Sequence, residues 1–273
     1  RAQLETYRGI DADRLRGHLI DFLAEVSPLA QELGLRLCCH PDDPPFDLLG
    51  LQRVMSTEAD YAAVTAAVDI PANGITLCSG SLGVRADVDL PGMMDRLGDR
   101  VHFLHLRNVR REGEGLPVSF HEAAHLEGGT DMVALAAAIL REERRRKAAG
   151  RSDRSIPMRP DHGHVILDDV RRETRPGYPA IGRLRGLAEL RGIFTALDHP
   201  TPPGGFGQRN LNAIKPETET SCHYFWSQSQ DVEPRSTEFT DAFYNQILTA
   251  FLQDWEVFDM QQANWDDRPV IET

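Results

Sequence analysis

The chain has 273 residues, of which 41% are hydrophobic and 26% charged, as is ordinary for a globular protein. Its formal net charge of −12 argues against a nucleic-acid backbone or a membrane surface as the main partner. No stretch approaches the roughly 20 apolar residues of a membrane-spanning helix, and the charged N-terminus does not resemble a signal peptide. Four cysteines, two of them adjacent, form no disulfide framework, so we expect a cytoplasmic protein.

The composition changes near residues 201–210, where prolines and glycines cluster. Residues 210–273 hold three basic and twelve acidic side chains and all three tryptophans, whereas most arginines lie earlier. This contrast predicts two units of different origin, residues 1–200 and 211–273, joined by a seam at 201–210. The alternative is one domain with an acidic, aromatic extension.

The first 200 residues alternate between helical and strand patterns. This alternation predicts right-handed βαβ units, a parallel sheet and therefore an α/β fold. The expected helices cover residues 11–33, 57–68, 91–97, 131–148 and 179–196, and the expected strands cover 35–39, 75–77, 101–104 and 156–159. The buried stripe of the last helix is expected at Ile181, Leu184, Leu187, Ala188 and Leu190.

Each of the four strands is followed by a residue type that binds metals, namely His40, Cys78, His105 and Asp161. These residues should converge, because the carboxyl ends of parallel strands meet at one edge of a sheet or barrel. Imidazole, thiolate and carboxylate together suit Fe(II), Mn(II) or Zn(II). The alternative is that each is an ordinary structural residue, as a lone buried cysteine usually is.

Five motifs occur in order: His-Pro-Asp-Asp-Pro-Pro from residue 40, Leu-Cys-Ser-Gly-Ser-Leu-Gly from 77, His-Phe-Leu-His-Leu-Arg-Asn from 102, Phe-His-Glu-Ala-Ala-His-Leu from 120 and Arg-Pro-Asp-His-Gly-His from 159. Together they resemble the mannonate dehydratase family over about residues 1–200. The resemblance implies a (β/α)₈ TIM-type barrel. It also implies dehydration of D-mannonate to 2-keto-3-deoxy-D-gluconate in hexuronate breakdown, with Mn²⁺ or Fe²⁺ as the cofactor and a small sugar acid as the partner.

The resemblance also implies roles for individual residues. The metal ligands would be His40, Cys78, His105 and Asp161, and the acid–base pair would be His162 and Tyr178. Dehydration takes a proton from the carbon next to the carboxylate and protonates the hydroxyl that leaves, and a His and a Tyr can exchange these protons. Arginine binds carboxylates in bidentate pairs, so the candidate substrate-binding residues are Arg107, Arg159 and Arg175.

About four βα units precede residue 200, whereas a complete (β/α)₈ barrel has eight strands in about 250 residues. We therefore expect a partial barrel in a chain that is a fragment, with little or no turnover. The open strand edges of such a half-barrel favour pairing with another copy, in a homo-oligomer. Both a genuine fusion and a misassembled, chimeric reading frame stay open as origins of the two parts.

The segment at 214–226 resembles a late strand of the catalytic domain in Rieske-type aromatic ring oxygenases and O-demethylases. Residues 239–262 then follow an amphipathic helical pattern. The resemblance places Asp254 where that family completes a two-His, one-carboxylate iron site, but the family's other iron ligands find no match upstream. An oxygenase remnant is the alternative function, and an ordinary solvated acid is the simpler interpretation of Asp254.

The run from His121 to His125 matches the His-Glu-x-x-His pattern of zinc proteases. That pattern works only on a helix, which puts both histidines on one face with the glutamate as base. Glycines and a proline before the run, and Gly128 and Gly129 after it, do not favour a helix. A zinc metalloprotease is therefore a less favoured further alternative.

Overall fold

The structure is a computed structural model that divides into two compact units, Arg1–Pro200 and Thr201–Thr273. The residues that it describes are 2–198, 208–216, 222–230, 241, 244–245 and 248–249.

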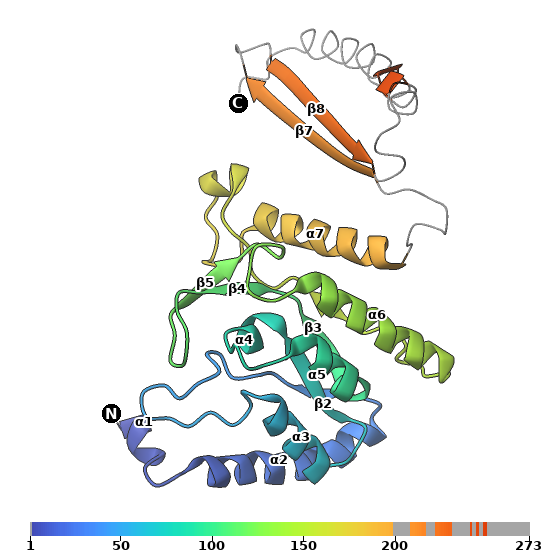
Figure 1. The fold of residues 1–273 in the computed structure, drawn as a ribbon. Coiled ribbons are helices and arrows are strands. Elements are labelled where there is room, and N and C mark those ends of the chain that lie inside the picture. Colours follow the sequence, from blue (N-terminus) through green and yellow to red (C-terminus); the bar gives the residue numbers. More distant parts are fainter. Residues whose placement is uncertain are drawn as a thin grey trace, which may run out of the picture. The chain divides into compact units, whose positions relative to one another are not determined.

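A four-stranded sheet forms the centre of the first unit (Figure 1). Every neighbouring pair of its strands is parallel. The strands lie in the order β1 (Leu37–Cys39), β2 (Asn73–Cys78), β3 (Val101–His105) and β6 (Met158–Arg159). Each overlaps a segment that the sequence predicts as a strand, so the α/β fold with TIM-barrel-like parallel strands is confirmed.

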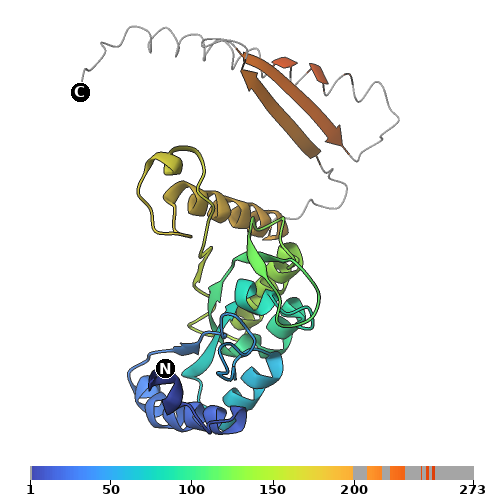
Figure 2. The same ribbon diagram turned by 90° about the vertical axis from the view of Figure 1, so that its left-hand side faces the viewer.

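Helices follow one another along this sheet in chain order (Figures 1 and 2). Helices α2 and α3 pack together, as do α5 and α6, and α6 and α7. The helices are α1 (Ala2–Thr6), α2 (Ala12–Glu32), α3 (Glu58–Ala67), α4 (Ser79–Gly83), α5 (Leu90–Leu97), α6 (Met132–Ala148) and α7 (Ala180–Asp198), with short 3₁₀ turns at Gly98–Arg100 and Leu167–Arg171.

Four of the described helices begin where a side-chain oxygen can accept a backbone N–H. The N-caps of α2, α3, α5 and α6 are Asp11, Thr57, Asp89 and Asp131, and each accepts from the N–H three residues later. Such a cap stabilises a helix by about 1 kcal/mol. The five helices that the sequence predicts start within one residue of their observed starts, whereas the five-residue helices α1 and α4 were not predicted.

The core lies between the sheet and these helices. Strand β2 is buried along its whole length, and Ile75 and Leu77 have no exposed surface. Met93 of α5 and Leu135 of α6 are equally buried in the same cluster. Each fully buried side chain of this size contributes about 1.5–3 kcal/mol. This packing fixes the sheet on which the functional side chains are placed.

The predicted buried stripe of α7 was partly wrong. Leu190 is buried as expected, but Leu184 is 64% exposed. Gly182 and Gly186 are buried instead, because the backbone of His164 and the ring of His125 lie directly against them and leave no room for a β-carbon. A helix face that packs through glycine carries no apolar signal in the sequence.

A hairpin that the sequence did not predict follows β3. Its strands β4 (Asn108–Arg111) and β5 (Phe120–Ala123) are antiparallel and pair Val109 with Glu122. Glycine and charged residues fill the connection between them. Because each strand is only four residues long and mostly polar, its alternation is too short to stand out.

The second unit contains β7 (Gln208–Pro216) and β8 (Cys222–Gln230), which pair antiparallel. The sequence predicted one strand here, at 214–226, and the structure instead divides this stretch between the end of β7 and the start of β8. The described residues at 241, 244–245 and 248–249 are helical, within the helix predicted at 239–262. Asp254 lies outside the described residues. Across the described parts of the chain, no helix combines the length and apolar character needed to cross a bilayer.

A buried ion pair anchors α6. Arg146 Nε donates to Glu142 Oε1 at 2.7 Å, and its Nη2 donates to the carbonyl of Val101 at the start of β3 at 2.8 Å. We predict that Arg146→Met lowers the free energy of unfolding by about 3 kcal/mol or more, because removing one partner of a buried pair strands the other charge. Urea unfolding followed by far-ultraviolet circular dichroism measures this, since all three tryptophans lie outside this unit.

The matched control is Arg141→Met on the same helix, where an exposed guanidinium pairs with Asp95. Exposed pairs contribute at most about 1 kcal/mol, so this variant should unfold close to the wild type. Equal destabilisation by the two substitutions would contradict the anchoring role of Arg146.

Candidate active site

Three of the four predicted metal ligands meet at one edge of the sheet. His40, Cys78 and His105 each bring one ligand atom to within 4.8 Å of the other two. The cause is the sheet register, which pairs Cys78 at the end of β2 with His105 at the end of β3, while His40 directly follows β1. His40 Nε2 and His105 Nδ1 are 3.0 Å apart.

The fourth predicted ligand, Asp161, lies beside this group rather than inside it. Its Oδ2 is 3.7 Å from His105 Nδ1, and its Oδ1 accepts from Arg159 Nη2 at 2.8 Å. The residue is buried and has a φ of 64°, which is uncommon for a residue other than glycine. Arg183 Nε holds this backbone by donating to the Asp161 carbonyl at 2.9 Å. Such local strain is found often at functional sites.

The surroundings of the Cys78 thiol lower its pKa. Burial raises its pKa, but hydrogen bonds with His105, His40 and Ser81 outweigh burial and lower the pKa to about 6. The N–H and hydroxyl of Ser81 lie 3.5 and 3.4 Å from the sulfur. The thiolate is the form that ligates metals, and a pKa of about 6 favours the thiolate at neutral pH.

The donor set fits a divalent metal ion. Two imidazoles and a thiolate with a carboxylate next to them suit Fe(II), Mn(II) or Zn(II). Cys78 is fully buried whereas His40 is exposed. The group of three side chains therefore borders the core at Cys78 and is accessible to solvent at His40.

The predicted acid–base pair adjoins the metal-ligand group. His162 Nε2 is 3.2 Å from the Tyr178 hydroxyl, and the two rings meet edge to face with centroids 5.0 Å apart. The same Nε2 lies 4.0 Å from Asp161 Oδ2. The hydrogen bond that His162 donates to the Glu122 carboxylate raises the pKa of His162, burial opposes this increase, and the charge of Asp161 adds to it. Arg183 lies 5.5 Å from the centre of the Tyr178 ring.

The three predicted substrate-binding arginines differ in their surroundings. Arg107 is buried, and its Nη1 and Nη2 pair with Asp43 at 2.7 Å and Glu122 at 2.8 Å. Arg159 pairs with Asp161 and is half-exposed, and Arg175 is exposed. Both ends of the Arg107 guanidinium are therefore occupied by carboxylates of the protein itself.

The zinc-protease interpretation of the run from His121 to His125 was wrong. Its first residues form strand β5 instead of a helix, and successive residues of a strand point to opposite faces. His121 is exposed and pairs with Glu112, whereas His125 is buried, with its Nε2 2.5 Å from the carbonyl of Leu106. Glu122 faces Arg107 and His162.

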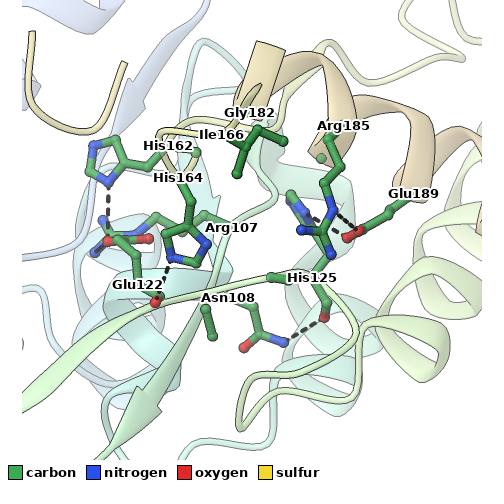
Figure 3. A pocket seen from close by; sticks show the side chains of 14 residues that line it. Arg107, Asn108, Glu122, His125, His162, His164, Ile166, Gly182, Arg185 and Glu189 are labelled. Atoms are coloured by element: carbon green, nitrogen blue, oxygen red, sulfur yellow. Dashed lines mark hydrogen bonds and ion pairs between the residues drawn. The ribbon is translucent and has the colours of Figure 1, made fainter. Parts of the chain in front are cut away.

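Glu122 is the residue of the candidate site that sequence reasoning missed, because it considered Glu122 only as the base of the less favoured zinc-protease pattern. Figure 3 shows its carboxylate between the Arg107 guanidinium and the His162 ring, on the wall of a pocket that reaches His125 and Glu189. The signal for its role was its place in a motif shared with the dehydratase family, but the motif alone does not say which side chain it faces.

The D-mannonate dehydratase (UxuA) family model matches residues 1–201. The chain belongs to the D-mannonate dehydratase family. It is 60% identical over 205 residues to mannonate dehydratase 1 of Agrobacterium fabrum, covering 75% of this chain and 50% of that protein. It is 59% identical over 201 residues to the mannonate dehydratase of Rhizobium meliloti, covering 74% of this chain and 50% of that protein. The chain thus spans about half the length of these curated relatives.

A solved structure agrees with this assignment. The crystal structure of mannonate dehydratase from Streptococcus suis serotype 2 is 31% identical, with a TM-score of 0.63 over 72% of this chain and 53% of that one. A second family model, the vanillate O-demethylase oxygenase C-terminal domain, matches residues 169–273 and so overlaps the first over α7.

We predict that Co²⁺ added to the chain gives an intense near-ultraviolet band from charge transfer between thiolate and metal, and that Cys78→Ala removes it. The reason is that Cys78 is the one cysteine in the group of His40, Cys78 and His105. An absorbance titration measures the band and its stoichiometry.

Cys38→Ala is the matched control, because Cys38 is an exposed cysteine on the neighbouring strand β1. This variant should keep the band at full intensity. A band that survives in Cys78→Ala, or disappears in Cys38→Ala, would contradict the assigned ligand set.

Proposed function

We propose that this chain supplies the metal centre and the acid–base pair for the dehydration of D-mannonate to 2-keto-3-deoxy-D-gluconate, a hydro-lyase reaction of hexuronate breakdown. The observation that carries the proposal is the gathering of His40, Cys78 and His105 next to the pair of His162 and Tyr178. The 60% identity to a mannonate dehydratase supports the choice of substrate.

The proposed cofactor is one Mn²⁺ or Fe²⁺ ion held by His40, Cys78, His105 and Asp161. The low thiol pKa and the closeness of Asp161 to His105 support this set. Such an ion would stabilise the negative charge that develops on substrate oxygens when the proton next to the carboxylate is removed.

His162 and Tyr178 would then move the protons. Their reacting atoms are 3.2 Å apart, close enough to serve neighbouring carbons of one substrate. One group takes the proton from the carbon next to the carboxylate. The other protonates the hydroxyl on the following carbon, which leaves as water.

Binding of the substrate carboxylate is proposed for Arg159 and Arg175. Arg159 is half-exposed and Arg175 exposed, so both are accessible to a ligand. Arg107 was a candidate for the same task. Its pairing with Asp43 and Glu122 favours a different one, that of orienting protein groups.

We also infer the organisation of the chain: a dehydratase-like unit at residues 1–200, a seam at 201–210 and an oxygenase-like segment at 211–273. The two family matches and the division into two compact units support this. The edges of the four-stranded sheet favour association with a second copy.

A second candidate function, a remnant of an aromatic oxygenase, is supported by the vanillate O-demethylase match alone. In that case Asp254 would take part in iron binding. Weak visible d–d bands of Co²⁺ without the thiolate band, lost in Asp254→Ala and kept in Cys78→Ala, would favour this second candidate.

We predict that the purified chain with Mn²⁺ turns D-mannonate over far more slowly than the full-length Agrobacterium fabrum relative, because four parallel strands provide only part of a barrel pocket. Tyr178→Phe and His162→Gln should each lower the remaining kcat by about 10²–10⁴-fold. Long incubations that accumulate the 2-keto product measure these rates.

Tyr7→Phe is the control, since Tyr7 is exposed to nearly the same degree as Tyr178, 48% against 43%. Its turnover should equal that of the wild type. Turnover equal to that of the full-length relative would contradict the expectation of a partial pocket. Wild-type rates in Tyr178→Phe and His162→Gln would contradict the acid–base assignment.

A further inference from the structure

Glu122 joins the hairpin to the acid–base pair. It lies on β5, and its Oε1 is 3.1 Å from Nδ1 of His162, the ring nitrogen turned away from Tyr178 (Figure 3). Glu122, His162 and Tyr178 therefore form a line of hydrogen-bond partners that starts on β5 and ends in the segment before α7.

The Glu122 carboxylate is itself held in place. Its Oε1 also contacts Arg107 Nη2 at 2.8 Å, and the Arg107 side chain is 5% exposed. The Ser79 hydroxyl donates to the Arg107 carbonyl at 2.6 Å and accepts from the Arg107 N–H at 3.1 Å. Gly80 leaves space that the Arg107 side chain occupies. A fixed, buried guanidinium holds the carboxylate in one orientation.

Glu122 Oε1 lies between the Arg107 Nη2 donor and His162 Nδ1, and a carboxylate oxygen that faces a guanidinium accepts hydrogen bonds, so the proton between Glu122 and His162 is assigned to His162 Nδ1. A neutral imidazole with its proton on Nδ1 has its lone pair on Nε2, which is the nitrogen that faces Tyr178. We propose that Glu122 is a positioning residue, which fixes His162 in the Nδ1–H tautomer and directs the basic Nε2 toward Tyr178.

The catalytic use of this tautomer rests on the proposed dehydration. The tautomer itself is inferred from the hydrogen-bond geometry. In the proposed reaction, Nε2 of His162 exchanges a proton with the substrate, and the Glu122 carboxylate stabilises the imidazolium that forms. Without Glu122 the ring could take the opposite tautomer, which presents an N–H to Tyr178 and no base to the substrate.

The chain offers a matched comparison for this pair. Glu112 Oε1 and His121 Nδ1 are also 3.1 Å apart, the same atoms and distance as in the pair of Glu122 and His162. Both side chains of the first pair, however, are more than half exposed. Among the described residues, no arginine forms an ion pair with Glu112, whereas the buried Arg107 pairs with Glu122. Replacing Glu112 therefore removes a glutamate–histidine pair without touching His162.

The test is long-range ¹H–¹⁵N NMR of the imidazole rings in the Zn²⁺-loaded chain, because Zn²⁺ is diamagnetic. Spectra are recorded above the titration range of histidine, and the His162 signals are assigned by their loss in His162→Gln. The expected result is the Nδ1–H pattern for His162 in the wild type and in Glu112→Gln, and a shift toward the Nε2–H pattern in Glu122→Met. An Nε2–H pattern in the wild type, or an unchanged pattern in Glu122→Met, would overturn the proposal.

Glu122→Gln keeps an acceptor oxygen for Arg107 and His162 and guards against misfolding of the methionine variant. It should lower kcat by about 10²-fold with little change in KM, because the charge that stabilises the imidazolium is lost. Wild-type kcat in Glu122→Gln would overturn the proposal. If the chain binds Zn²⁺ and His162 has the Nδ1–H tautomer but D-mannonate is not turned over, the proposed dehydration is contradicted and the role of Glu122 is not. If D-mannonate is turned over while His162 has the Nε2–H tautomer, the role of Glu122 is contradicted and the dehydration is not.

Discussion

The parallel pairing of β1, β2 and β3 determines where the chemistry of this chain is located. Cys78 and His105 occupy paired positions at the carboxyl ends of β2 and β3, and His40 directly follows β1. The buried packing of Ile75 and Leu77 holds this register. A slip by one residue would turn Cys78 to the opposite face of the sheet, so the donor set and the core depend on the same pairing.

The hairpin after β3 adds the other half of the site. It carries Glu122 to His162, while the loop after β1 brings Asp43 to Arg107. The two carboxylates neutralise a buried guanidinium that would otherwise be costly to hold away from water. The proposed metal-ligand group and the proposed acid–base pair are thus supported by separate interactions that meet at Asp161, which lies near both His105 and His162.

The sequence was sufficient for the sheet and for the residues at its carboxyl edge, because strand ends in a βαβ protein follow from hydrophobic periodicity and capping residues. The sequence was insufficient for elements whose packing leaves no apolar or periodic pattern in the residues. Helix α7 packs through Gly182 and Gly186, which have no side chains and so give no apolar signal in the sequence. The four-residue strand that carries Glu122 is too short and polar to detect. Glu122 illustrates the limit well: the glycines and proline around its motif disfavour a zinc-protease helix, but only the structure shows that its carboxylate faces Arg107 and His162.

The most direct test of the central claim is X-ray absorption of the Zn²⁺-loaded chain at the metal edge. The account predicts one sulfur neighbour at about 2.3 Å together with nitrogen or oxygen neighbours at about 2.0–2.2 Å, with the sulfur lost in Cys78→Ala. A first shell made only of nitrogen and oxygen in the wild type would contradict it, because the parallel strands would then not bring Cys78 to the metal.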